Sequence, residues 1–573
     1  ADPDSLIQMG LYRGYYDQPN IWLALITPPI PHKEWEYAYL VQGGCNPDHH
    51  LRNERLVPDP LTRVYGKDTQ ANFSKVIDAS HYEWNDKDWH TPSMQDLIIY
   101  EASVYGITQG NPKIPKDQQG TFKGLSALIH HGYFKNLGMT VLALMPTSEA
   151  PSLQGPESMG YDPCGFASIE RDFGTPDDLR ELIDTAHQHG MAVIADLVFN
   201  HTSNMFNPLW GLISDGSDGG FYFSGSTPWG NRIATEREEI QNFLIDVSKL
   251  LLKEYHFDGF RFDATHSSWM SHDFLHRLAY EIKGKGFKAD CILIAENLPN
   301  EYDLNLDGYN GFAQWCDPFH DKVKALLREG VYQDWVTNDP AHLADVFYFS
   351  KAFYSAHTNN AINYCESHDE NSVPFEVGTS GDGLVYDEAK TRKAKLGLFA
   401  TALALGQPMI YMGQEFGTDR PRNLVLFDWP NNPKENPFYS WTRRLFSLRH
   451  RYSGLRIFGY DPERDGAFHW LVGPWMDESH GKDRTIIGWR TSIKQPAQDF
   501  AVFFNFGPQP VQVDLELGRP GVWLKLADID SVNDTPPEGL NTPNDPSAIH
   551  TEDGSFHGFQ IPGSSGFVYQ WYQ

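Results

Sequence analysis

The stretch Gly259-Phe260-Arg261-Phe262-Asp263-Ala264-Thr265-His266 sets two opposite charges within an apolar run. In a β-strand every second side chain points to the same face, so Arg261 and Asp263 share a face. Removing an unpaired ion from water is costly, and charges inside a buried strand therefore need a partner. The guanidinium can keep the carboxylate ionised, as a carboxylate nucleophile requires, with a purely structural ion pair as the alternative.

The segments around this stretch alternate between apolar strands and amphipathic helices. One helix is predicted over 124–136, a second begins at the N-cap Thr175 and ends at Gly190, and a third covers Ile240–Leu251. Eight segments have strand character: Asp96–Glu101, Met139–Pro146, Met191–His201, Gly259–His266, Cys291–Leu298, Phe312–Cys316, Ala361–Ser367 and Pro408–Met412. This alternation predicts an α/β fold, a (β/α)₈ TIM barrel over residues 96–453, with a doubly wound open sheet as the alternative.

Both flanks of the predicted barrel have a β-type pattern. Residues 1–95 predict an N-terminal β-sandwich-like domain, and residues 454–573 predict a C-terminal antiparallel β domain. The segment Tyr82–His90 contains Trp84 and Trp89 and is interpreted as a linker that packs onto the barrel.

Composition excludes several classes of partner. The chain of 573 residues carries 46 basic and 75 acidic side chains, a net charge of −29, which argues against nucleic acids and anionic membrane surfaces. The longest apolar run, Leu396–Leu405, is too short to span a bilayer. Five cysteines without paired spacing predict no disulfide framework, and Cys291 and Cys365 are expected to be reduced core residues. No signal peptide is visible, so we expect a cytoplasmic protein, with secretion as the alternative.

Polar residues gather where the predicted strands end, which is where barrel active sites are built. The segments are 196–201, 261–266, 296–297 and 366–369. They bring three carboxylates from separate strands, and glycoside cleavage needs two carboxyl groups, one ionised and one protonated. Arg261 would keep Asp263 charged, whereas the apolar run before Glu296 would raise the pKa of that carboxyl and make it a proton donor.

These four segments resemble the four signature regions of the α-amylase superfamily of retaining (β/α)₈ glycoside hydrolases and transglycosylases, over about residues 96–450. The resemblance implies a double displacement with Asp263 as nucleophile, Glu296 as acid/base and Asp369 as the carboxylate that grips sugar hydroxyls. It also implies a set of substrate-binding residues: Tyr161, His201, Arg261, His266 and His368. For a retaining enzyme we expect the two catalytic carboxyls to lie about 5–5.5 Å apart.

Finer features of the resemblance point in two directions. The N-terminal β domain resembles the carbohydrate-binding-type module that precedes branching enzymes, debranching enzymes and trehalohydrolases. The sequence Glu366–Glu370 is most similar to branching enzymes, whereas His266 after the nucleophile is similar to trehalohydrolases. The excursion over 202–237 is short, which favours an open cleft for a polymer or a branched glucan.

Three functions remain open. A branching-type glucanotransferase (1,4-α-glucan branching enzyme-like) is the leading hypothesis, and an α-glucan hydrolase of amylase, debranching or trehalohydrolase type is the alternative. Both act on a starch- or glycogen-like glucan or a maltooligosaccharide and differ only in whether water or a glucan hydroxyl attacks the covalent intermediate. A silent sugar-binding relative is disfavoured because all three carboxylates are present.

The sequence predicts neither a metal nor an organic cofactor. The family's amylases have Lys-His at the positions held here by His266 and Ser267, and that His helps to bind calcium through its backbone. Its replacement by Ser267 therefore predicts no calcium site between the third and fourth strands.

Overall fold

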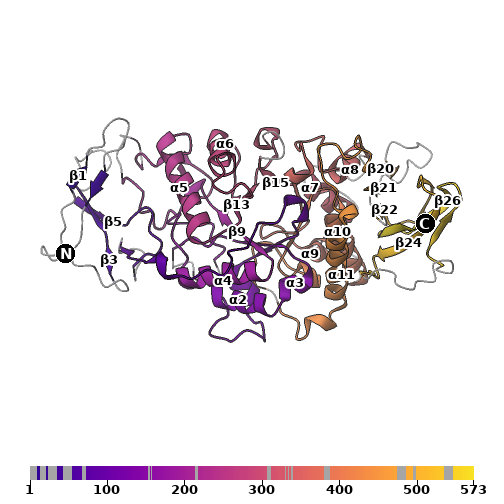
Figure 1. Cartoon of the computed structure of the whole chain (residues 1–573), viewed down its shortest axis with the longest axis horizontal. Helices are drawn as coiled ribbons and strands as arrows, with labels where there is room; N and C mark the ends of the chain where they lie inside the picture. Colours follow the sequence, from indigo (N-terminus) through magenta and orange to yellow (C-terminus); the bar gives the residue numbers. More distant parts are fainter. Residues whose placement is uncertain are drawn as a thin grey trace.

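The computed structural model describes residues 10–12, 21–23, 35–42, 54–66 and 73–572, apart from gaps at 152–154, 156–157, 213–216, 218, 306–310, 329–330, 333–334, 337–339, 380–386, 427, 474–484, 494–497 and 535–545. Along its longest axis, the early strands lie at one end, the helix-covered barrel in the middle and the C-terminal strands at the other end (Figure 1).

Eight parallel strands close into a barrel, which confirms the TIM-barrel prediction and excludes the open sheet. Each predicted strand segment overlaps one of them: β7 (Ile99–Ala102), β8 (Val141–Leu144), β9 (Ala192–Leu197), β13 (Gly259–Phe262), β14 (Ile292–Ala295), β15 (Ala313–Trp315), β18 (Ala361–Asn363) and β19 (Gln407–Tyr411). Pairing of β19 with β7 closes the ring. In this register Arg261 lies opposite Asp196 on β9 and Ile294 on β14.

Helices cover the outside of the barrel. They are α1 (Val104–Thr108), α2 (Phe122–His130), α3 (Tyr133–Leu137), α4 (Pro176–Gln188), α5 (Glu238–Glu254), α6 (His272–Ala279), α7 (Asp317–Leu327), α8 (Pro340–Phe347), α9 (Val373–Thr379), α10 (Asp387–Leu403) and α11 (Pro437–Arg451). Helix α4 has the predicted start, a capping box between Thr175 and Asp178. The single helix predicted over 124–136 is wrong: Gly132 adopts a φ of 71° and separates α2 from α3.

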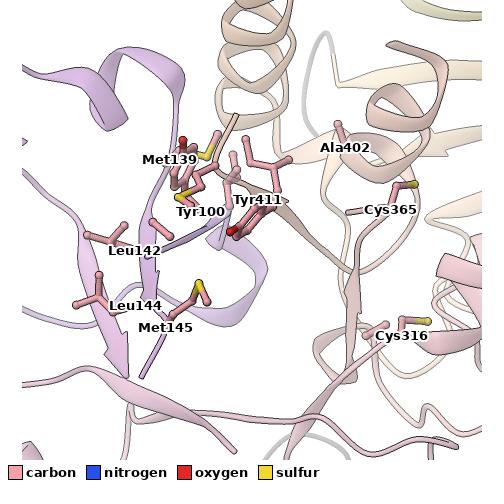
Figure 2. Packing of buried hydrophobic residues seen from close by; sticks show 14 of the residues in the cluster. Tyr100, Met139, Leu142, Leu144, Met145, Cys316, Cys365, Ala402 and Tyr411 are labelled. Atoms are coloured by element: carbon pink, nitrogen blue, oxygen red, sulfur yellow. The ribbon is translucent and has the colours of Figure 1, made fainter. Parts of the chain in front are cut away.

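Side chains alternate between two hydrophobic layers along each barrel strand. The inner layer fills the barrel with Leu97, Ile99, Val141, Ala192, Ile194, Ile292, Ile294, Ala313, Trp315, Ile362, Tyr364 and Met409. The outer layer packs the strands against the helices, and Figure 2 shows part of it, where Tyr100 of β7 and Leu142 of β8 lie near Met139. The predicted reduced cysteines Cys291 and Cys365 are free and buried.

The predicted linker packs onto the end of the barrel opposite the strand carboxyl termini. Trp84 stacks on His256 with ring centroids 3.7 Å apart, and Trp89 stacks on His187 at 4.6 Å. Before this linker, the described strands form antiparallel pairs: β1 (Gly10–Tyr12) with β2 (Ile21–Leu23), β3 (Glu36–Tyr37) with β6 (Ser74–Lys75), and β4 (Tyr39–Gln42) with β5 (Glu54–Val57). How these pairs assemble into a domain stays a prediction.

Asp258, just before β13, is the polar centre of this linker contact. Its fully buried carboxylate accepts hydrogen bonds from Trp89 Nε1 (2.8 Å), the Thr91 hydroxyl (2.7 Å) and the Val193 amide (2.8 Å). His187 Nε2 lies 2.9 Å away. Burial alone would raise the pKa of Asp258, but the hydrogen bond and the charge of His187, with Lys288, hold it below its ordinary value.

Asp258→Ala is expected to lower the free energy of unfolding by about 3–5 kcal/mol, since it leaves several buried donors unpaired. Because the folded-state pKa is depressed, the ionised carboxylate stabilises the fold fully above about pH 4 and loses this effect as the pH falls through the lower folded value. Urea unfolding followed by tryptophan fluorescence measures the difference. Asp88→Ala, an exposed carboxylate beside Trp89, is the control; equal effects of the two substitutions would contradict the prediction.

The C-terminal region is antiparallel, as predicted. One sheet contains β20 (Phe468–Val472), β21 (Ile486–Ser492), β22 (Asp499–Asn505), β24 (Gly521–Asp528), β25 (Ile549–Thr551) and β27 (Ser565–Tyr572), and a second pairs β23 (Val511–Glu516) with β26 (Ser555–Ile561). Among the described helices, none has the length and apolar character needed to cross a membrane.

Candidate active site

Strand alternation continues past the inner hydrophobic layer into a layer of charges. On β9 the inward positions Ala192 and Ile194 are followed by Asp196, and on β14 the inward position Ile294 is followed by Glu296. The same step of two residues leads from Ile99 to Glu101 at the end of β7. The chain therefore places several carboxylates together at the carboxyl end of the barrel.

The guanidinium of Arg261 contacts three carboxylates at this end of the barrel. Arg261 Nη1 lies 2.8 Å from Asp196 Oδ2 and 3.0 Å from Asp263 Oδ1, and its Nη2 lies 2.8 Å from Glu296 Oε2. Arg261 is 3% exposed, and the ring of Trp315 covers it at 4.2 Å. Asn200 Nδ2 also donates to Asp263 Oδ2 at 2.8 Å. The Asp263 carboxylate thus receives charged and neutral donors that stabilise its ionised form.

Glu296 lies in a different environment. Burial raises its pKa to about 7, with Asp263 and Asp369 acting in the same direction and Arg261 opposing them. The backbone N–H of Ala264 donates to Glu296 Oε2 at 2.8 Å. Ala264 directs this N–H from a left-handed backbone with a φ of 41°, a conformation that residues with a Cβ rarely adopt. A neutral Glu296 carboxyl near pH 7 is suited to donate a proton.

A second polar group lies beside the first. His368 Nδ1 is 2.6 Å from Glu101 Oε1, and its Nε2 is 3.2 Å from Asp369 Oδ2. Burial alone would lower the pKa of His368, but the two carboxylates hold it well above its ordinary value. Burial would raise the pKa of Asp369, but His368 and more distant arginines lower it to about 2. The ring of Tyr161 stacks on His368 at 4.6 Å, and its hydroxyl donates to Asp196 Oδ2 at 2.5 Å.

The remaining predicted site residues differ in position. His201 is buried and contacts Asn200, the neighbour of the nucleophile candidate, while its Nε2 lies 3.0 Å from the Tyr161 carbonyl oxygen. Burial lowers the pKa of His201 and keeps the ring neutral. His266 is not brought into this cluster: its ring packs at 5.5 Å from Trp269, and its Nδ1 accepts the amide of Ser268.

Two charged residues of the cluster, Glu101 and Asp196, were not among the predicted site residues. Both belong to strands that were correctly predicted. The alternation of side chains along each strand could have identified them. A carboxylate two residues after an inward-facing apolar side chain points to the same side of the strand, which is the inside of the barrel.

Two groups of side chains among the described residues could hold a metal ion: His272 with Glu301 and Asp303, and Asp317 with His320 and Asp321. Neither lies between β9 and β13, where the sequence predicts no calcium. From the presence of Ser267 we expect activity on an α-glucan to be unchanged after dialysis against EDTA, measured as reducing ends released. Activity that collapses with the chelator and returns only with calcium would overturn this prediction.

Comparisons with known proteins agree with this geometry. Residues 108–211 match the family model described as "Alpha amylase, catalytic domain". A malto-oligosyltrehalose trehalohydrolase of Saccharolobus solfataricus is 29% identical over 412 residues, 66% of this chain and 67% of the relative. A glycogen debranching enzyme of Yersinia enterocolitica is 25% identical over 609 residues, 90% of this chain and 89% of the relative.

The fold has solved counterparts as well. The structure of a pullulanase from Anoxybacillus sp. LM18-11, complexed with maltotetraose, superimposes with a TM-score of 0.71 at 19% identity, covering 91% of this chain and 77% of that one. The closed eight-stranded barrel, the layer of carboxylates at its carboxyl end and these relatives make the chain similar to the α-amylase superfamily of glycoside hydrolases and transglycosylases.

Proposed function

We propose that this chain is a retaining α-glucan hydrolase in which Asp263 is the nucleophile, Glu296 the acid/base and Asp369 the carboxylate that binds sugar hydroxyls. The observation that carries the proposal is the shared guanidinium of Arg261. It holds Asp263 and Glu296 next to each other, while burial raises the pKa of Glu296 to about 7.

The two carboxyls divide the reaction into two displacements. In the first, an Asp263 oxygen attacks the anomeric carbon, the glycosidic C–O bond breaks, and Glu296 gives its proton to the departing oxygen. In the second, the Glu296 carboxylate takes a proton from water, whose oxygen displaces Asp263 from the same carbon. Each step inverts the anomeric carbon, so the product retains the α configuration.

The other residues of the cluster prepare the sugar and the carboxylates. The ring of Tyr161 offers a flat apolar surface beside His368, and Asp369, with its side chain half exposed, extends from His368 toward solvent. An ionised carboxylate next to an imidazolium can accept sugar hydroxyls without losing its charge. We infer that these three residues bind the sugar that becomes attached to Asp263.

Hydrolysis is favoured over transfer by the names of the relatives, a trehalohydrolase and a debranching enzyme. The test is to incubate the enzyme separately with malto-oligosyltrehalose, a branched glucan and amylose. Release of trehalose or of linear chains, with reducing ends rising in step, supports a hydrolase of the corresponding kind. Amylose that loses its iodine colour and gains α-1,6 linkages without new reducing ends would instead indicate branching.

The second candidate is the branching-type glucanotransferase that the sequence suggested first. The sequence motif Glu366–Glu370 favours this transferase. The chemistry of the transferase differs from that of the hydrolase only in the molecule that attacks the glycosyl-enzyme in the second displacement. The same amylose assay distinguishes the two candidates.

A further inference from the structure

Glu101 is a buried carboxylate to which the mechanism above gives no role. It lies near the end of β7 and is 3% exposed. Its Oε1 is 2.6 Å from His368 Nδ1, and its Oε2 accepts the backbone N–H of the same residue at 3.2 Å. Both carboxylate oxygens of Glu101 thus contact His368, which lies in the loop after β18, although 267 positions separate the two residues in the sequence.

The surroundings of His368 require protons on both ring nitrogens. Nδ1 faces the Glu101 carboxylate and Nε2 faces the Asp369 carboxylate at 3.2 Å. The other groups around the ring are the Tyr161 ring, stacked at an interplanar angle of 14°, its hydroxyl 3.4 Å from Nδ1, and the Trp315 ring at 6.0 Å. Because carboxylates only accept hydrogen bonds, a ring nitrogen that faces one must carry a proton to bond to it, and a ring with protons on both nitrogens is an imidazolium.

The stack and the two carboxylates also fix the orientation of the ring. Tyr161 prevents the imidazole from tilting, and Glu101 prevents it from rotating about its axis. The Asp369 side chain is half exposed and reaches back to His368 Nε2, so the position of its carboxylate depends on that ring. A change at Glu101 is therefore transmitted to Asp369 through His368.

We propose that Glu101 is a positioning residue of the reaction, which holds His368 as a fixed imidazolium and through it aims the Asp369 carboxylate at the bound sugar. This inference rests on the proposed function, since it assigns Asp369 to sugar binding. Glu101 itself touches no sugar in this scheme.

Glu101→Gln tests the charge while keeping the shape, because the amide oxygen can still accept from Nδ1. We expect kcat/KM on an α-glucan to fall about 10- to 100-fold. The loss should be larger at pH 8 than at pH 6, because without the Glu101 carboxylate the pKa of His368 falls toward its ordinary value and the ring loses its second proton more readily as the pH rises. A reduction by the same factor at both pH values would contradict the proposal.

Glu415→Gln is the matched control. Glu415 is also a buried carboxylate at the carboxyl end of the barrel, following β19, but it accepts hydrogen bonds from Tyr100 and Tyr133. Its replacement likewise changes a buried carboxyl into an amide, but without contact to His368. We expect a loss of thermal stability and no change in the shape of the pH profile. A profile that shifts as it does in Glu101→Gln would mean that any buried carboxylate near the site has this effect.

A spectroscopic measurement keeps the inference independent of activity. With ¹³C-labelled histidine, the Cε1–H signal of His368 can be assigned by its absence from His368→Asn. In the unaltered protein this signal should not titrate between about pH 6 and pH 9, whereas in Glu101→Gln it should. Titration near pH 6.5 in the unaltered protein would overturn the proposal, even if Glu101→Gln did not fold. If the protein cleaved no α-glucan, the proposed function would be wrong. The histidine signal would still show whether His368 is protonated.

Discussion

Asp263→Asn is expected to abolish formation of a glycosyl-enzyme with every substrate, including an activated α-glucosyl fluoride. An amide oxygen cannot act as the nucleophile, although it can keep the hydrogen bond from Asn200. We expect kcat to fall about 10⁵-fold or more, the scale associated with removal of a nucleophile. Intact-protein mass spectrometry after reaction with the fluoride detects the adduct.

The control for this variant is Asp88→Asn, an exposed carboxylate near the opposite end of the barrel, which should form the adduct normally. A covalent glycosyl adduct on the Asp263→Asn protein would show that another residue is the nucleophile.

Glu296→Gln is expected to separate the two catalytic roles. For a natural glucan the barrier should rise by about 3–6 kcal/mol, because proton donation to the leaving group is lost. A fluoride leaving group scarcely needs that proton, so the first displacement should survive. Attack by water on the intermediate does need the base, and a glycosyl-enzyme linked to Asp263 should therefore accumulate.

Azide needs no general base and is the matched probe for this variant. Its addition should restore turnover of the fluoride by Glu296→Gln and give an azide product of retained configuration. If Glu296→Gln were as inactive toward the fluoride as Asp263→Asn, with no trapped adduct, the roles of the two carboxyls would have been assigned wrongly.

Much of the barrel was predictable because its strands are short apolar runs bounded by clear turns. Helix α4 was predictable in detail, since Thr175, Pro176 and Gly190 are local signals that need no tertiary context. The break at Gly132 was missed because the apolar spacing continues across it, and only a positive φ separates α2 from α3. Periodicity alone does not reveal the backbone conformation of one glycine.

Contacts between site residues on the same strand were predictable from the sequence, whereas contacts between residues on different strands were not. Arg261 and Asp263 share a strand, so their contact follows from strand geometry. The pairing of Glu101 with His368 does not, because it depends on β7 and β18 both lying beside β19 in the closed barrel. His266 illustrates the opposite case: it belongs to a matching motif, but the chain turns after Thr265 and its ring packs on Trp269.

The guanidinium of Arg261, shared by three carboxylates, also affects how catalytic activity could be lost during evolution. Losing one carboxylate alone would leave a buried cation with part of its negative surroundings gone, which destabilises the fold as well as the reaction. Substitutions at Arg261 and Asp263 therefore do not act independently. Descendants that keep the barrel as a non-catalytic sugar receptor should replace the arginine together with its carboxylates, so that evolutionary decay of this site proceeds by paired changes.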